Sequence, residues 1–244
     1  MFPILLLQTG DYMISEKFAC QCSNYPTQYC SYDRLYNLSK NVKFEYVPVG
    51  TVEYVKKYCE IVGINLPTTF YTYPEELNEY LDRKVIKGIL KDSNETHFVK
   101  PYDRIKFFTG TIKNKLRPLS SNTKVWISEP VKFESEFRFY IHNVIGLDPI
   151  VGWMRYDDLN VKNPDPDINY VLSMVEKLKD YYMSAYTIDI GWRPDINKYS
   201  LVEVNDFWSI GLYANNDIQS KPITKQDYAD MLVSRWRQIL FCQL

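Results

Sequence analysis

Short apolar segments rich in β-branched and aromatic residues recur between residues 96 and 204, and this recurrence constrains the fold more than any other feature of the chain. Such segments, separated by turn residues, are typical of strands. The predicted strands cover residues 96–100, 124–129, 136–142, 144–156, 186–192 and 199–204. The last two are joined by the turn-rich Arg193-Pro194-Asp195, so we expect them to form a strand pair.

The rest of the chain alternates between strand and helix patterns. Apolar segments predict strands at 4–7 and 43–49, and helical spacing or start signals predict helices at 51–63, 75–90, 168–178 and 224–239. The last helix begins at a capping box, Thr224-x-x-Asp227. We therefore expect an α+β protein, with a small α/β lobe and helical link over residues 1–90 and a largely antiparallel sheet lobe over residues 91–244.

Composition excludes several classes of protein. With 45% hydrophobic residues among 244, the chain can bury a core and is not a disordered protein. Lys+Arg number 29 and Asp+Glu 30, a net charge of -1, which argues against a nucleic-acid partner held by bulk positive charge. No apolar segment is long enough to span a membrane, and residues 2–7 lack the features of a signal peptide. We expect a cytoplasmic protein with no membrane partner.

The five cysteines are an odd set, so a complete disulfide framework is not expected. Cys20, Cys22 and Cys30 cluster, but a zinc site needs a fourth ligand and both histidines, His97 and His142, lie far away in sequence. Free thiols in a reducing compartment are the favoured interpretation.

Oxygen-bearing side chains recur on the last two predicted strands. Glu203 and Asn205 alternate with Val202 and Val204, so they point to one face while the valines point into the core. If the two strands pair, Asp189 converges with them, and such oxygen ligands suit Mg²⁺. The alternative is three polar residues on the solvated face of a sheet.

A lysine ends an earlier apolar strand. Lys100 follows Phe98-Val99 and precedes a turn that carries Arg104 and Lys106, an arrangement that suits phosphate binding. The alternative is a strand-end lysine whose ammonium group simply reaches water.

A third signal lies around a Pro-containing connector. Glu129-Pro130-Val131 follows an apolar strand, so its backbone can present hydrogen-bonding groups to an adenine edge. Glu136 and Arg138 share one face of the next strand, where a carboxylate can accept from ribose hydroxyls and an arginine can reach a phosphate. They can equally form an ion pair on an exposed sheet.

In this order the three signals resemble the ATP-grasp superfamily. More closely, the chain resembles a small phage and bacterial ATP-grasp clade formerly catalogued as a domain of unknown function, the Arg-to-Lys clade. The resemblance spans about Lys43 to Leu240. Its motifs are residues 49–54, 99–110, 135–138, 186–191, 201–206, 210–213 and 235–236.

The resemblance implies an ATP-grasp fold in which two lobes enclose ATP and Mg²⁺. It implies an ATP-dependent ligase that joins a small-molecule or peptide carboxylate to an amine, or to a thiol, through an acylphosphate. The implied contacts are Lys100 to the α- and β-phosphates, Arg104 and Lys106 over the phosphates, Glu129 and Val131 to adenine, Glu136 to ribose, and Asp189, Glu203 and Asn205 to metal.

The sequence departs from the superfamily pattern at several positions. Thr187 stands where related ligases carry an arginine, so we expect Arg138 and Arg155 to meet the phosphoryl charge, with Lys162 behind them. Lys106, on the loop over the phosphates, is also expected to be catalytic. The phosphate loop has a single glycine, Gly110, and the linker is short, so Arg83 is expected to replace a nucleotide-binding lysine of that region.

Two other functions fit the same residues. An ATP-dependent kinase would use the same nucleotide site without a second nucleophile. The third alternative is a catalytically inactive nucleotide-binding or interaction module. The presence of Asp189, Glu203 and Asn205 argues against it, because an inactive site need not retain metal ligands.

Overall fold

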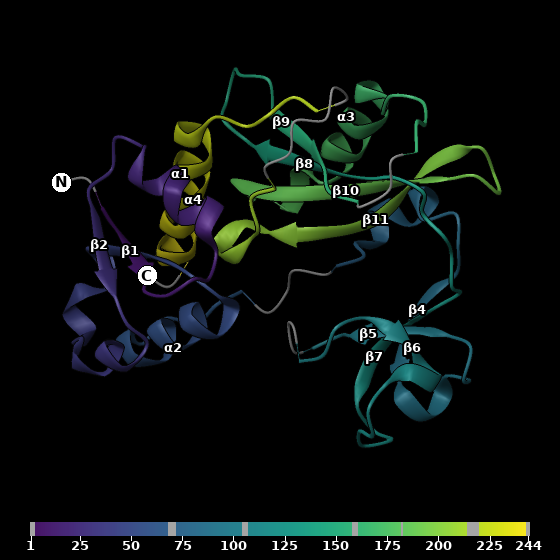
Figure 1. Cartoon of the computed structure of the whole chain (residues 1–244), viewed down its shortest axis with the longest axis horizontal. Helices are drawn as coiled ribbons and strands as arrows, with labels where there is room; N and C mark the ends of the chain where they lie inside the picture. Colours follow the sequence, from purple (N-terminus) through teal and green to yellow (C-terminus); the bar gives the residue numbers. More distant parts are fainter. Residues whose placement is uncertain are drawn as a thin grey trace.

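The structure is a computed structural model that describes residues 3–67, 72–103, 107–157, 161–181, 183–213 and 220–242. Within these ranges the strands form one three-stranded sheet and two four-stranded sheets. Figure 1 shows the three-stranded sheet at the N-terminal end of the molecule, with the two four-stranded sheets on the other side. The strand and helix patterns of the sequence predicted a mixed α+β architecture of this kind, and the structure confirms it.

The three-stranded sheet is parallel and has its first strand in the middle. β1 (Ile4–Gln8) lies between β2 (Thr27–Cys30) and β3 (Tyr46–Val49). The helices α1 (Ile14–Gln21) and α2 (Val52–Val62) belong to this part. The predicted start and end of α2 are confirmed, because Thr51 Oγ1 accepts from the Tyr54 N–H at 3.3 Å and Gly63 adopts a φ of 73°.

The larger antiparallel sheet carries the predicted hairpin. Its strand order is β11 (Lys198–Asp206), β10 (Ala185–Arg193), β8 (Glu136–His142) and β9 (Ile150–Arg155), and each neighbouring pair is antiparallel. Helix α3 (Ile168–Lys177) packs on one face, where Val171, Phe139 and Ile188 are fully buried in one core. The opposite face carries the polar residues described below.

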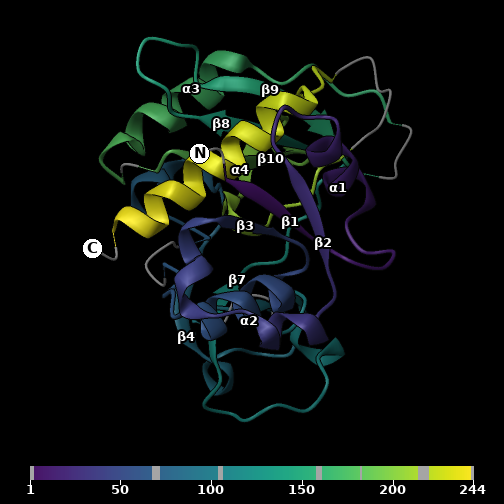
Figure 2. The same ribbon diagram turned by 90° about the vertical axis from the view of Figure 1, so that its left-hand side faces the viewer.

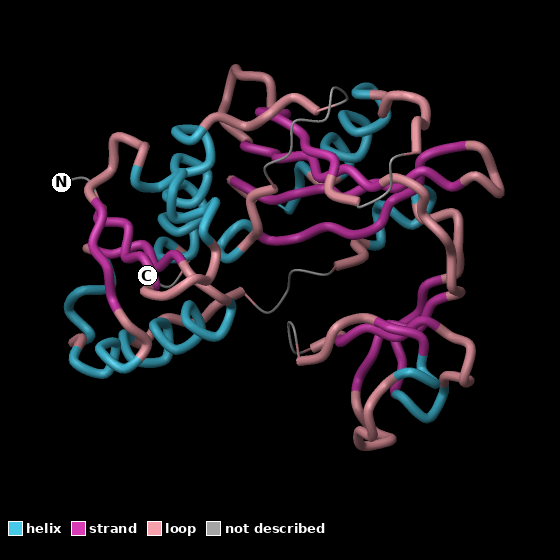
Figure 3. The backbone as a smooth tube through the Cα atoms, in the orientation of Figure 1, coloured by secondary structure: helices cyan, strands magenta, loops and turns pink. Residues whose placement is uncertain are grey.

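The smaller antiparallel sheet has the order β4 (Val85–Ile89), β7 (Lys124–Ser128), β5 (Phe98–Pro101) and β6 (Thr111–Ile112). Figure 3 shows it as a group of strands separate from the larger sheet. The helix predicted over residues 75–90 is wrong: a short 3₁₀-helix covers Glu75–Tyr80, and residues 85–89 form β4. Backbone pairing with β7 decides the conformation of this β-branched segment. Strand β4 precedes residue 90, whereas β5, β6 and β7 follow it. The smaller sheet therefore contains strands from both sides of the lobe boundary that we expected between residues 90 and 91.

Helix α4 (Lys225–Phe241) is near the end of the chain but completes the core of the N-terminal sheet. Leu5, Tyr58 and Trp236 belong to one buried cluster, and the rings of Tyr58 and Trp236 lie 5.9 Å apart. Figure 2 shows α4 crossing near β1 and α1. Thr224 caps this helix as predicted, since its Oγ1 accepts from the Asp227 N–H at 3.0 Å.

Short 3₁₀-helices connect these elements, and all five cysteines are free thiols. The 3₁₀-helices are Asp33–Asn37, Lys40–Phe44, Glu75–Tyr80, Leu90–Asp92, Lys113–Lys115, Lys179–Tyr181 and Phe207–Ser209. None of the helices in the described ranges has the length and apolar character needed to cross a membrane.

Candidate functional site

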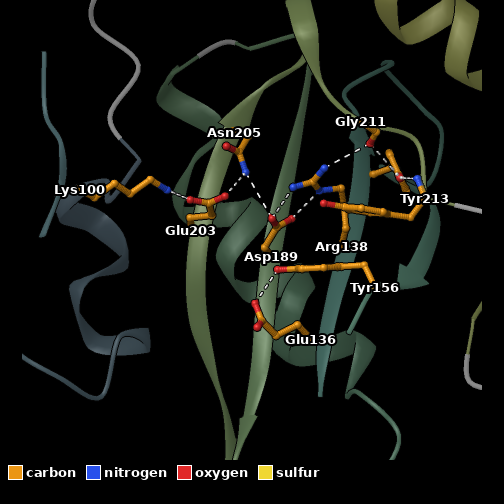
Figure 4. A network of polar contacts seen from close by, with 10 residues as sticks. Lys100, Glu136, Arg138, Tyr156, Asp189, Glu203, Asn205, Gly211 and Tyr213 are labelled. Atoms are coloured by element: carbon orange, nitrogen blue, oxygen red, sulfur yellow. Dashed lines mark hydrogen bonds and ion pairs between the residues drawn. The ribbon is translucent and has the colours of Figure 1, made fainter. Parts of the chain in front are cut away.

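Three adjacent strands of the larger sheet place charged residues in one row. Asp189 on β10 pairs in register with Glu203 on β11 and with Arg138 on β8. Directly paired residues project from the same face of a sheet, so the three side chains lie side by side. Two residues further along β11, the Asn205 Nδ2 lies 3.1 Å from Glu203 Oε1 and 3.3 Å from Asp189 Oδ2. The structure thus brings Asp189, Glu203 and Asn205 together (Figure 4).

A β-bulge shapes β11 next to this row. The register shifts between Asp189 and Ile190, so Leu201 and Val204 are buried whereas Val202 is half-buried. The alternating pattern predicted Val202 in the core, which is wrong because the bulge turns that residue outward. The Arg83 guanidinium donates to the carbonyls of Leu201 at 2.7 Å and Val202 at 3.1 Å, so this arginine supports the backbone at the bulge.

Arg138 and Asp189 form a buried ion pair. The Arg138 Nε and Nη2 donate to the two oxygens of Asp189 at 2.9 Å and 2.7 Å. The exposed fractions are 6% and 0%. Burial alone would lower the pKa of Arg138, but the charge of Asp189 and the bonds to it raise the pKa above its ordinary value. Arg138 therefore stays a cation whose first partner is the carboxylate of Asp189, not that of Glu136.

Two stacked tyrosine rings lie beside the guanidinium of Arg138. The rings of Tyr156 and Tyr213 stack with centroids 4.7 Å apart, and the Arg138 Cζ lies 5.6 Å and 4.8 Å from them. The Tyr156 hydroxyl donates to Glu136 Oε2 at 2.7 Å. Burial raises the pKa of Glu136, although the bond from Tyr156 opposes that rise. Sequence reasoning singled out Glu136 but missed Tyr156, and it gave Tyr213 no role although that residue lies in a quoted motif.

Lys100 connects the smaller sheet to this face. It lies on β5, and its ammonium group forms an ion pair with Glu203 Oε2 on β11 (Figure 4). The side chains are 24% and 19% exposed, so water can reach the pair. Arg104 and Lys106, which were predicted to cover the phosphates, lie outside the described residues.

Gly110 has a steric reason to be glycine. A Cβ at this position would come within 2.6 Å of the Phe98 ring, so the backbone passes close to the side chain of a residue on β5. The same glycine was expected to mark a phosphate loop. The contact explains the glycine through local packing.

The predicted adenine connector follows β7. The Glu129 N–H donates to the Lys84 carbonyl at 3.3 Å, and Glu129 Oε2 accepts from the Lys84 N–H at 3.1 Å. These bonds fix the start of the segment that leads to β8. Val131 lies half-buried on that segment, and its adenine contact remains a prediction.

Arg155 lies away from the charged row. On β9 it pairs in register with Phe137, whose side chain is buried in the core beneath α3, whereas Met154 pairs with Arg138. Its guanidinium donates to both oxygens of Asp157, at 2.8 Å and 3.0 Å, and to the Val161 carbonyl at 2.8 Å. We correct the expected phosphoryl contact for Arg155, because neighbouring residues of a strand point to opposite faces.

Thr187 occupies the next row of the polar face, between Tyr140 on β8 and Asn205 on β11. It is fully buried, and its hydroxyl has no hydrogen-bond partner among the residues that the structure describes. A small neutral side chain therefore stands where the resemblance led us to look for a cation. Arg138, one strand away, supplies the buried positive charge of this face.

The donor chemistry of the row fits a hard cation. Asp189 and Glu203 offer carboxylate oxygens, which Mg²⁺ prefers, and Asn205 would offer its amide oxygen after a rotation that turns its Nδ2 away from the two carboxylates. In the described ranges, no three His, Cys, Asp or Glu side chains gather as a metal cluster. A cation here would therefore rely on two carboxylates and one amide.

Comparison with known proteins identifies the family. The sequence matches the model of the ATP-grasp domain, Arg-to-Lys clade family 3, over residues 45–238. None of the curated proteins matches this chain.

Solved structures share the fold. The ATP-grasp ligase PsnB with a minimal precursor has a TM-score of 0.53 at 12% identity, over 96% of this chain and 100% of that chain. The ADP complex of purK, an N5-carboxyaminoimidazole ribonucleotide synthetase, gives 0.52 at 10%, over 97% and 78%. An L-amino acid ligase from Bacillus licheniformis gives 0.50 at 11%, over 84% and 66%. At these identities the likeness shows a shared fold, and together with the match over most of the sequence it leads to one conclusion: the chain belongs to the ATP-grasp family, in its Arg-to-Lys clade.

Proposed function

We propose that this chain is an ATP-dependent ligase that joins a carboxylate to an amine, or to a thiol, through an acylphosphate. One observation carries the proposal. A lysine from the smaller sheet, Lys100, meets an oxygen-rich group on the larger sheet, Asp189, Glu203 and Asn205, in a chain of the ATP-grasp family. The fold neighbours named as ligases support the same reaction class.

The contacts in the structure suggest how the site receives its nucleotide. We assign Lys100 to the α- and β-phosphates, which means that it exchanges the carboxylate of Glu203 for phosphate when ATP binds. Glu203 is then free to act with Asp189 and Asn205 as a metal-binding group. Bound Mg²⁺ would neutralise phosphate charge, the chemistry that phosphoryl transfer requires.

Other groups complete the proposed nucleotide site. We assign Glu129 and Val131 to adenine, Glu136 to ribose, and Arg104 and Lys106 to the phosphates. Arg83 supports the backbone of β11 beside Glu203, and we propose that it acts on the nucleotide through that strand. Arg138 holds Asp189 and provides the cationic charge that Thr187 cannot.

The proposed reaction has two steps. A carboxylate oxygen of the substrate attacks the γ-phosphorus of ATP, the bond to the bridging oxygen breaks, and ADP leaves. The amine or thiol then attacks the acyl carbon, loses its proton, and releases phosphate. No residue of the chain forms a covalent intermediate, so the protein contributes position and charge.

The experiment is a screen of carboxylate pools for Mg²⁺-dependent ADP formation, with and without added amines or thiols, followed by mass spectrometry of the products. A ligase forms a C–N or C–S product only when both substrates are present. ADP formation with a stable phosphorylated product would indicate a kinase instead. Absence of ADP formation, together with no thermal stabilisation by millimolar Mg-ATP, would refute a nucleotide site. Binding at such a site raises the free energy of unfolding by about 2.7 kcal/mol when the nucleotide is at a hundredfold excess over its Kd.

A further inference from the structure

One peptide bond links the N-terminal sheet region to the charged row. The carbonyl of Gly211 accepts from the Arg138 Nη1 at 3.2 Å, and the N–H of Leu212, on the other side of the same peptide, donates to Glu16 Oε1 at 2.5 Å. Glu16 lies on α1, whereas Arg138 lies on β8. Arg138 therefore binds the carbonyl end of this peptide dipole, and Glu16, from another part of the molecule, binds its N–H end.

Further hydrogen bonds hold this peptide in place. The Tyr140 hydroxyl also donates to the Gly211 carbonyl, at 3.3 Å, and accepts from the Tyr213 N–H at 3.2 Å. Glu16 is only 6% exposed. A buried carboxylate is costly unless it receives hydrogen bonds, and the Leu212 N–H supplies one to Glu16.

We propose that Glu16 is a positioning residue for the metal-binding face. Glu16 fixes the Gly211–Leu212 peptide, this peptide fixes the Arg138 guanidinium, and Arg138 fixes the carboxylate of Asp189. The inference rests on the proposed function, since it assumes that Asp189 holds a cation. It gives a role to residues 3–44, which lie outside the matched family region.

The test separates the reach of the side chain from its charge. Glu16→Gln keeps an oxygen at the same distance, so it can still accept from Leu212. Glu16→Asp keeps the charge but is shorter by one methylene and withdraws the acceptor. Glu60→Ala on α2 removes an exposed carboxylate of the same lobe, paired only at the surface with Lys57, and serves as the matched control.

The measurement is equilibrium binding of Mn²⁺, a probe for the cation site, to the full chain with ADP present, followed by electron paramagnetic resonance. Residues that orient metal ligands change affinity by about 10- to 100-fold when altered. We expect Glu16→Asp to weaken Mn²⁺ binding about tenfold, whereas Glu16→Gln and Glu60→Ala stay within about threefold of the unaltered protein. Circular dichroism verifies that each variant is folded.

A double-mutant cycle with Arg138→Lys adds a second readout. If both residues act on one peptide, the double variant with Glu16→Asp loses less Mn²⁺ affinity than the product of the single losses. Unchanged Mn²⁺ affinity in Glu16→Asp, or an equal loss in Glu16→Gln, would overturn the role of Glu16 while leaving the proposed function standing. Failure of the unaltered protein to bind Mn²⁺ at all would overturn both.

Discussion

In the part of the chain that the structure describes, the two antiparallel sheets have four strands each but differ in how they are supported. The larger sheet is buried on both sides along β10, and its charged row includes Asp189 and Arg138 at 0% and 6% exposure. The smaller sheet has its own small cluster of buried residues. That cluster consists of Leu90, Val99, Phe108, Val125 and Ile127.

The difference suggests a division of tasks. A buried, hydrogen-bonded row keeps its geometry before any ligand arrives, which suits metal binding. A sheet with few buried apolar contacts has lower local stability and can adjust around a ligand. Lys100, which we assign to phosphate, lies on the less supported sheet, and its ion pair with Glu203 joins the two. The following predictions test this contrast.

The largest effect is expected for Glu203→Gln. The amide keeps the shape but removes the charge needed to hold a cation, so ADP formation should fall roughly 10³-fold, the upper range for one lost electrostatic contact. A coupled ADP assay measures this, with Glu176→Gln on the exposed face of α3 as a control. Turnover within a few fold of the unaltered protein would make Glu203 an ordinary surface residue.

Arg138→Ala should lower both turnover and stability. It leaves Asp189 buried without its cation, a loss of about 3–5 kcal/mol in the free energy of unfolding. Turnover of the folded protein should fall about a hundredfold. Arg155→Ala is the matched control, since it breaks a buried arginine–aspartate pair on the other face. Urea unfolding should show a lower free energy of unfolding for both variants, and only Arg138→Ala should lose turnover strongly. Equal losses of turnover in the two variants would show that the two faces of the sheet do not differ in function.

Lys100→Ala should weaken nucleotide binding about tenfold, a loss of about 1.4 kcal/mol in binding free energy. Because its ion pair with Glu203 is partly exposed, the free energy of unfolding should change by less than about 1 kcal/mol. Isothermal titration with a non-hydrolysable ATP analogue measures the affinity.

Lys106→Ala should instead lower turnover more than affinity, as expected for a contact made mainly in the transition state. If Lys100→Ala and Lys106→Ala lose the same affinity and neither loses turnover, the different roles assigned to the two lysines are wrong.

A further test compares two buried valines. Val99 lies in the smaller sheet and Val171 in α3 against the larger sheet, and both are fully buried. Each change to alanine should cost about 2 kcal/mol locally. Hydrogen exchange should show Val99→Ala accelerating amides of β5 and β7 only, whereas Val171→Ala should also accelerate β10. Equal acceleration of β10 in both variants would mean that the sheets unfold as one unit.

Local patterns predicted part of this structure because part of it is local. The hairpin of β10 and β11 follows from two alternating segments and a short turn, and its antiparallel register brings Asp189 beside Glu203. The bulge that turns Val202 outward leaves no trace in the alternation. The segment 85–89 was assigned to a helix because a few β-branched residues after a helix-start signal do not reveal the pairing with β7.

Contacts between distant residues could not be predicted in the same way. Glu16 and Leu212 are 196 positions apart, and Arg138 and Asp189 are 51 apart. The side chain of Arg138 was correctly placed on the face of Glu136, but its partner depended on which strand lies next to β8. Helix α1 and strand β2 were missed because residues 8–31 carry no clear period, and their structure depends on packing against β1 and α4.

The position of α4 has a consequence for how this protein is made. The buried strand β1 is synthesised long before Trp236, which packs in the same cluster as Leu5. At about 5–20 residues per second, β1 waits for this helix for roughly 10–50 s. During that time the apolar strand Ile4–Gln8 needs shelter from other chains, because its core is complete only after α4 has been synthesised.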